Sequence, residues 1–77
     1  MSRIVPIPAR RLRRVFERAG FRRVRTEGDH YVYTKEGVIR PVVIPDWPEV
    51  PVFIIKNNLR SAGMSREEYF RLLEDTH

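Results

Sequence analysis

The sequence contains no cysteine and only two histidines, His30 and His77. Disulfide bonds and thiolate metal sites are therefore excluded. Two histidines without cysteine do not make an ordinary structural zinc site, so we expect neither a metal nor another cofactor. The chain has 77 residues, which predicts one domain over residues 1–77. A core this small depends on good packing or on a partner chain.

Long apolar runs are also missing from the sequence. No stretch approaches the roughly 18 apolar residues that a membrane span requires. The first six residues, Met-Ser-Arg-Ile-Val-Pro, lack the apolar core of a signal peptide. We therefore expect a cytoplasmic protein with no membrane partner.

Positive charge is present in excess and is unevenly distributed. Residues 1–25 contain nine arginines and one acidic residue, Glu17, whereas residues 26–77 contain six basic and nine acidic residues. Thirteen of the fifteen basic residues are arginine, whose planar guanidinium makes bidentate contacts with phosphate. The concentration of charge in the first third of the chain predicts nucleic-acid binding, with a solvated basic face as the alternative.

The first part of the chain predicts a helix followed by three strands. Apolar residues recur at the spacing of one helix face over residues 9–19, with Pro8 as the first helical residue and Gly20 at the end. Branched and aromatic residues separated by short turns predict strands over residues 21–26, 30–34 and 38–44. Pro41 within the third segment indicates an edge position or an irregular start.

Two further helices complete the pattern. After Pro51, apolar residues return to helical spacing and continue until Gly63. Ser65 and Glu68 form a capping box that begins the last helix. The order α-β-β-β-α-α predicts an α+β fold, a three-stranded antiparallel sheet with helices on one face. The other face of the sheet would stay open to a partner or a nucleic acid.

His30 is the candidate for chemistry, because it begins a strand directly after a turn. A neutral imidazole can take a proton from an RNA 2′-hydroxyl, and its protonated form can return one to the leaving 5′-oxygen. Neighbouring arginines would stabilise the charge on the phosphate. Gly28, two residues earlier, allows the close approach of a backbone. The alternative is a strand-end histidine that bonds only backbone or solvent.

Each of three residues near this position has two possible roles. Asp29 could orient the His30 ring, but neighbouring residues of a strand point to opposite faces, so we assign Asp29 to the turn. Asp46 could reach the same site from the end of the third strand, or could cap a turn. Trp47 could stack on a base or anchor a partner. We favour the interpretation that Trp47 covers the small core.

Tyr31 and Tyr33 alternate along the second strand and therefore lie on one face of the sheet. On the open face they would be able to stack on bases, and on the other face they would belong to the core. The alternation alone does not decide between these two placements.

Four short elements follow one another in an order that is typical of one family: Ala19-Gly20-Phe21, Gly28-Asp29-His30, Ile44-Pro45, and Ala-Gly-Met-Ser-Arg-Glu-Glu-Tyr over residues 62–69. From about Pro8 to Leu73 the chain resembles the HicA-like toxins of type II toxin–antitoxin systems, short proteins that cleave messenger RNA. The resemblance implies a fold like that of double-stranded-RNA-binding domains. It also implies metal-independent RNA cleavage centred on His30 and a HicB-like antitoxin as partner.

The sequence departs from that family in two places. The residue between glycine and histidine is usually serine, and here it is Asp29. Many members have a second histidine soon after the Val-Pro step, where this chain has Asp46, Trp47 and Pro48. A negative charge at Asp29 would repel phosphate and weaken catalysis.

The leading hypothesis is an endoribonuclease toxin with His30 as general acid and base. The alternatives are a non-catalytic RNA-binding module of the same fold and a subunit that binds only protein through its open sheet face and Trp47. The residues that we expect to contact RNA are Arg10, Arg13, Arg14, Arg22, Arg23, Arg25 and Gly28.

Overall fold

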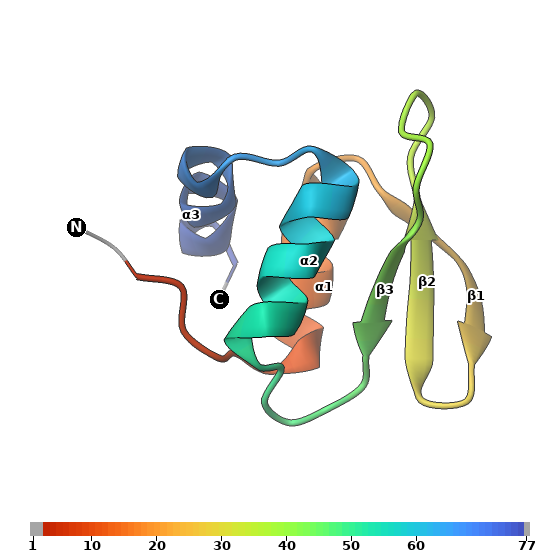
Figure 1. The fold of residues 1–77 in the computed structure, drawn as a ribbon, viewed down its shortest axis with the longest axis horizontal. Helices are drawn as coiled ribbons and strands as arrows, with labels where there is room; N and C mark the ends of the chain where they lie inside the picture. Colours follow the sequence, from red (N-terminus) through yellow and green to blue (C-terminus); the bar gives the residue numbers. More distant parts are fainter. Residues whose placement is uncertain (1–2, 77) are drawn as a thin grey trace.

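The computed structural model describes residues 3–76 and has the predicted order of elements (Figure 1). These are α1 (Ala9–Arg18), β1 (Arg22–Glu27), β2 (His30–Thr34), β3 (Val42–Pro45), α2 (Val52–Ala62) and α3 (Arg66–Glu74). The three helices lie on one side of the sheet, which confirms the α+β fold (Figure 1). No helix among the described residues is long and apolar enough to cross a membrane.

Helix α1 forms where the apolar periodicity predicts it and buries Leu12, Val15 and Phe16 completely. Pro8 is the residue before the helix rather than its first residue, with an extended backbone at φ −63° and ψ 148°. The chain leaves the helix at Gly20, whose φ of +98° is unfavourable for residues with a Cβ atom. Phe21 then returns to the core and packs edge-to-face against Phe16.

The sheet is an antiparallel meander in the order β1-β2-β3. Strand β1 spans Arg22–Glu27 rather than residues 21–26, and its register against β2 shifts between Arg23 and Arg25. This irregularity accounts for the imperfect alternation of the β1 sequence, because Val24 has no directly opposed partner. Every residue of β1 is exposed, so this strand is the uncovered edge of the sheet.

The predicted third strand, residues 38–44, begins too early. Strand β3 begins at Val42 instead of residue 38 and ends at Pro45. The main-chain N–H of Val38 bonds the Lys35 carbonyl at 3.0 Å, which holds the chain in a turn before the strand. Pro41 has no N–H with which to extend the ladder, so pairing starts directly after it.

The core lies between the sheet and the helices and includes residues from all three helices. Strand β3 contributes Val42 and Ile44, and α2 contributes Ile55 and Leu59. Helix α3 begins at the capping box, in which Ser65 Oγ accepts a hydrogen bond from the Glu68 N–H at 3.1 Å. It packs on α1, so the final segment of the described chain completes the core.

Candidate functional site

The candidate site lies at the end of the molecule where the β1–β2 turn, the β3–α2 loop and the start of α1 meet (Figure 1, lower end). Main-chain hydrogen bonds hold these three segments together. The Asp46 N–H donates to the Asp29 carbonyl at 2.6 Å, and the Ala9 N–H donates to the Trp47 carbonyl at 3.1 Å. Antiparallel pairing of β2 with β3 makes this meeting necessary, because the end of β3 lies opposite the start of β2.

His30 is the first residue of β2 and stands between Glu27 of β1 and Pro45 of β3 in the sheet register. The next residue, Tyr31, packs against the core on the helix side, so the side chain of His30 lies on the opposite face. Its side chain is 44% exposed. The prediction that His30 begins a strand at the end of a turn is confirmed, and the imidazole is accessible to a large ligand.

Asp29 occupies the turn, as the sequence predicts, and its carboxylate nevertheless reaches the histidine. Asp29 Oδ1 lies 2.8 Å from His30 Nδ1. The indole Nε1–H of Trp47 donates to Asp29 Oδ2 at 3.3 Å. The carboxylate therefore lies between two nitrogen groups, one from β2 and one from the β3–α2 loop.

The interpretation of Trp47 as a residue that covers the core is wrong. Trp47 is 38% exposed and lies outside the core cluster. Hydrogen bonds hold its main chain in the loop. Ile7 and Val50, which are joined by an isolated β-bridge, contribute their side chains to the core instead. The indole lines a shallow surface hollow together with Pro8, Ala9, Arg10, Asp46 and Pro48.

The sequence alone did not reveal the link between Trp47 and Asp29, although it contained a signal for it. Once residues 30–34 and 38–44 are paired as antiparallel neighbours, the residues after the later strand must approach the turn before the earlier one. That geometry brings Asp46 and Trp47 to Asp29, and the chemistry of an indole donor and a carboxylate acceptor completes the contact.

Gly28 has a structural reason to be glycine. It is the first residue of the two-residue turn between Glu27 and His30 and has φ +59°, as a type II′ hairpin turn requires. No atom lies within 4 Å of the position that a Cβ atom would occupy. The turn is consequently open to solvent on that side.

The arginines that we expected to contact RNA do not gather on one surface. Arg10 lines the hollow beside Trp47, and Arg14 lines a second hollow together with Pro8, Arg10 and Arg11. Arg22 pairs with Thr34 at the other end of β2 from His30. Strand β2 is five residues long, so its two ends lie roughly 13 Å apart at the usual rise per residue.

Arg13, Arg23 and Arg25 are among the candidate arginines that have contacts within the protein. The Arg13 guanidinium lies 4.0 Å from the centre of the Tyr31 ring, and that of Arg23 lies 5.8 Å from the same ring. Arg25 forms an ion pair with Glu27 on the exposed edge strand. Contacts of this kind restrain a guanidinium, and in the ion pair the Glu27 carboxylate also offsets the charge of Arg25.

The two tyrosines of β2 lie on the helix side of the sheet. Tyr33 is fully buried, and its hydroxyl donates to Glu17 Oε2 at 2.7 Å and accepts from Arg13 Nε at 3.1 Å. Burial raises the pKa of Tyr33, against the opposing effect of the bonded Arg13 guanidinium. Tyr31 is half-buried against the core. These placements favour a structural role for both side chains over stacking on bases.

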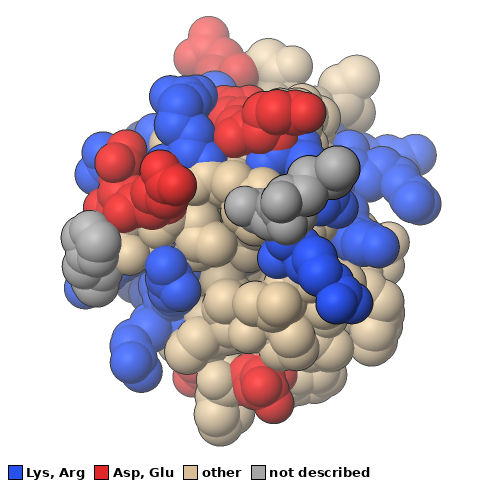
Figure 2. All heavy atoms as spheres, turned by 90° about the vertical axis from the view of Figure 1, so that its left-hand side faces the viewer, with Lys and Arg blue, Asp and Glu red and all other residues tan. Residues whose placement is uncertain are grey.

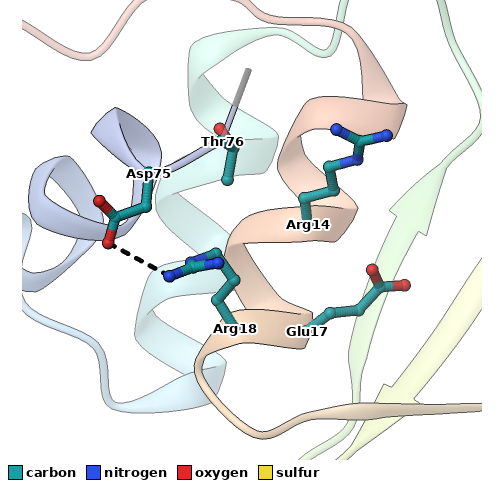
Figure 3. Close-up of a pocket in the computed structure, with 5 residues that line it drawn as sticks. All are labelled: Arg14, Glu17, Arg18, Asp75 and Thr76. Carbon is teal, nitrogen blue, oxygen red and sulfur yellow. Dashed lines mark hydrogen bonds and ion pairs between the residues drawn. The ribbon is translucent and has the colours of Figure 1, made fainter.

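A separate hollow between α1 and α3 is lined by Arg14, Glu17, Arg18, Asp75 and Thr76 (Figure 3). Arg18 reaches across it to Asp75 at 3.4 Å, whereas Arg14 and Glu17 point away from Asp75 (Figure 3). The side of the molecule that carries α3 shows acidic and basic side chains close together (Figure 2). The His30 end is the better candidate site because it offers a partly exposed imidazole, whereas none of the described residues that line this hollow is a histidine.

Among residues 3–76 no group of three or more histidine, cysteine or acidic side chains is placed to hold a metal ion. No curated protein matches the chain significantly. A family model described as the HicA toxin of bacterial toxin–antitoxin systems matches residues 9–64, from the first residue of α1 to just beyond α2. The matched region covers well over half of the chain and includes His30 and Trp47. This chain therefore belongs to the HicA toxin family.

Proposed function

We propose that this protein is the toxin of a type II toxin–antitoxin system and acts as a metal-independent endoribonuclease on messenger RNA, with His30 as its catalytic residue. The observation that carries the proposal is the position of His30 within the family match. The imidazole is exposed at an end of the sheet, and Asp29 contacts it only through Nδ1. No hydrogen bond or ion pair of Nε2 is found within residues 3–76, and the side chain as a whole is 44% exposed.

The proposed reaction is an intramolecular transesterification of an RNA phosphodiester. Nε2 of neutral His30 takes the proton of a 2′-hydroxyl, and the 2′-oxygen forms a bond to the adjacent phosphorus. The bond from phosphorus to the 5′-oxygen breaks, and the imidazolium returns its proton to that oxygen. The products are a 2′,3′-cyclic phosphate and a free 5′-hydroxyl, and no metal takes part in either proton transfer.

Phosphate binding at this end is assigned first to Arg10, which lines the hollow next to Trp47. A guanidinium there can stabilise the negative charge that develops on the phosphate oxygens. Gly28 lies in the open turn beside His30, where an RNA backbone can approach closely. The other arginine candidates, Arg13, Arg14, Arg22, Arg23 and Arg25, would bind the RNA chain beyond the reacting phosphate.

Membership in a family of toxins implies an antitoxin partner. We propose that this partner is HicB-like and that it covers the His30 end of the toxin in the cytoplasm. The exposed ring of Trp47 supports this proposal, because a large aromatic side chain at an accessible site is a frequent anchor in protein interfaces.

A non-catalytic RNA-binding module of the same fold is the second candidate. It is favoured by the two carboxylates at this end, Asp29 beside His30 and Asp46 in the adjoining hollow. Both carry negative charge toward the place where the phosphate of a substrate would lie. This candidate predicts salt-sensitive RNA binding that persists after His30→Ala, without cleavage.

The test is cleavage of a labelled messenger-RNA transcript by antitoxin-free protein in the presence of EDTA. Wild type should cut and His30→Ala should not, while both bind the transcript alike. His77→Ala is the matched control, because it makes the same change at the other histidine. A substrate with 2′-deoxyribose at the cleaved position should stay intact. If folded wild type binds the transcript and leaves it whole, the second candidate replaces the first.

A further inference from the structure

Asp29 makes one main-chain contact and two carboxylate contacts, although it lies in an exposed turn. The main-chain carbonyl of Asp29 accepts the Asp46 N–H at 2.6 Å, which holds the turn against the β3–α2 loop. Asp29 Oδ2 accepts the Trp47 indole N–H at 3.3 Å, and Asp29 Oδ1 lies 2.8 Å from His30 Nδ1. Each carboxylate oxygen therefore has one assigned nitrogen partner.

This arrangement decides which ring nitrogen of His30 carries the proton. A carboxylate has only acceptor oxygens, so the nitrogen 2.8 Å from Asp29 must be the donor, Nδ1–H. The other nitrogen, Nε2, then holds the lone pair that accepts a proton. A serine hydroxyl in place of Asp29 is able to donate as well as accept, and so leaves the tautomer of a neighbouring histidine undetermined.

We infer that Asp29, held in place by the indole of Trp47, is a positioning residue that fixes His30 in the Nδ1–H form with Nε2 as the proton acceptor. The inference rests on the proposed ribonuclease function for its catalytic consequence, whereas its structural content concerns the free protein. The negative charge of Asp29 thus orients the His30 ring, and this effect offsets its repulsion of phosphate. Trp47 acts through Asp29 and does not need to touch the RNA.

The first test is the tautomer of His30 in RNA-free protein, read from nitrogen-15 shifts at a pH where the ring is neutral. The His77→Ala variant assigns the signals, because it leaves His30 as the only histidine. Wild type should show the Nδ1–H form. Asp29→Asn should shift His30 toward the Nε2–H form, since the asparagine amide can donate to Nδ1. An Nε2–H form in wild type, or no change in Asp29→Asn, overturns the inference.

The second test is kinetic and uses the same RNA transcript. Asp29→Asn should lower kcat by roughly tenfold to a hundredfold, the range known for partners that orient metal-bound histidines, and should leave KM within about twofold. Trp47→Phe keeps an aromatic ring at this position and removes the indole N–H, so it should lower kcat less than Asp29→Asn does. Asp75→Asn, the same change at a distant carboxylate, should have no effect on kcat.

The two tests separate the inference from the proposed function. If Asp29→Asn and Trp47→Phe cleave RNA as fast as wild type, positioning by Asp29 is overturned while the ribonuclease stands. If wild type shows the Nδ1–H form, Asp29→Asn loses it, and no variant cleaves RNA, the positioning of the ring is supported and the ribonuclease is overturned.

Discussion

The phenolic oxygen of Tyr33 lies 2.7 Å from Glu17 Oε2, inside a core in which Tyr33 itself is fully buried. The same oxygen accepts a hydrogen bond from Arg13 Nε at 3.1 Å. An ionisable pair from α1 is thus joined to the central strand by one hydroxyl. The contact fixes α1 over β2, and with it the helix that bears Arg10 at the candidate site.

Removal of this hydroxyl should destabilise the fold. Tyr33→Phe leaves Glu17 and Arg13 without their shared partner, and we expect a loss of about 1–2 kcal/mol in the free energy of unfolding. Tyr69 offers a matched control, because it is equally buried and its hydroxyl has no partner within residues 3–76. Tyr69→Phe should cost nothing or stabilise slightly. Urea denaturation at pH 7 measures both, and equal losses would contradict the assignment.

Stability should fall in alkaline solution because of Tyr69. Burial raises the pKa of Tyr69 to about 12, against a smaller opposing effect of Arg11. The unfolded chain releases this proton near pH 10, so above that pH the folded protein holds one proton more than the unfolded protein. Stability that is fully present below pH 10 should therefore decrease by roughly 2 kcal/mol as the pH approaches 12. Denaturation at several pH values should show a smaller decrease for Tyr69→Phe, and an identical decrease would contradict the prediction.

The periodicity of the sequence was sufficient to predict the helices, because their buried positions depend on local spacing alone. Leu12, Val15 and Phe16 occupy the expected face of α1. The start of β3 was not predictable in this way, since residues 38–40 resemble a strand and are held in a turn by a hydrogen bond to Lys35. The local pattern of apolar residues does not show which main-chain N–H and carbonyl groups form hydrogen bonds across a turn.

The candidate site was predictable for His30 and not for its surroundings. A single histidine at a turn-to-strand boundary is visible in the sequence. The neighbouring carboxylate is that of Asp29, and its partner Trp47 lies 18 residues away along the chain. Trp47 was expected to cover the small core, and it is 38% exposed instead. The residues that fill the core beneath it, Ile7 and Val50, come together only through a long-range bridge.

The outer edge of β3 should depend on one side chain of α2. Asn58 Nδ2 donates to the Val43 carbonyl at 3.0 Å and is almost fully buried. Asn58→Ala leaves that carbonyl without its partner, which should cost about 1–3 kcal/mol and lower Tm by roughly 5–15 °C. Asn57→Ala, the same change at the exposed neighbouring position, should leave Tm almost unchanged. Thermal unfolding checks the pair, and similar shifts for both variants would show that the edge bond contributes little.

The position of Arg10 predicts how RNA binding divides among the arginines. Arg10 lines the hollow beside Trp47 at the His30 end, whereas Arg22 pairs with Thr34 at the far end of β2. In the His30→Ala background, which prevents cleavage, Arg10→Ala should weaken binding of a short single-stranded RNA severalfold. It should also reduce the slope of log K against log salt by about 0.7, the value for one lost phosphate contact. Arg22→Ala makes the same change in net charge and should leave both quantities nearly unaltered, provided that the RNA is too short to reach the far end of β2 from the His30 end. Fluorescence anisotropy over a salt series measures them. If Arg22→Ala weakens binding as much as Arg10→Ala does, the RNA follows β1 instead of the His30 end, and the site must be placed along that edge strand.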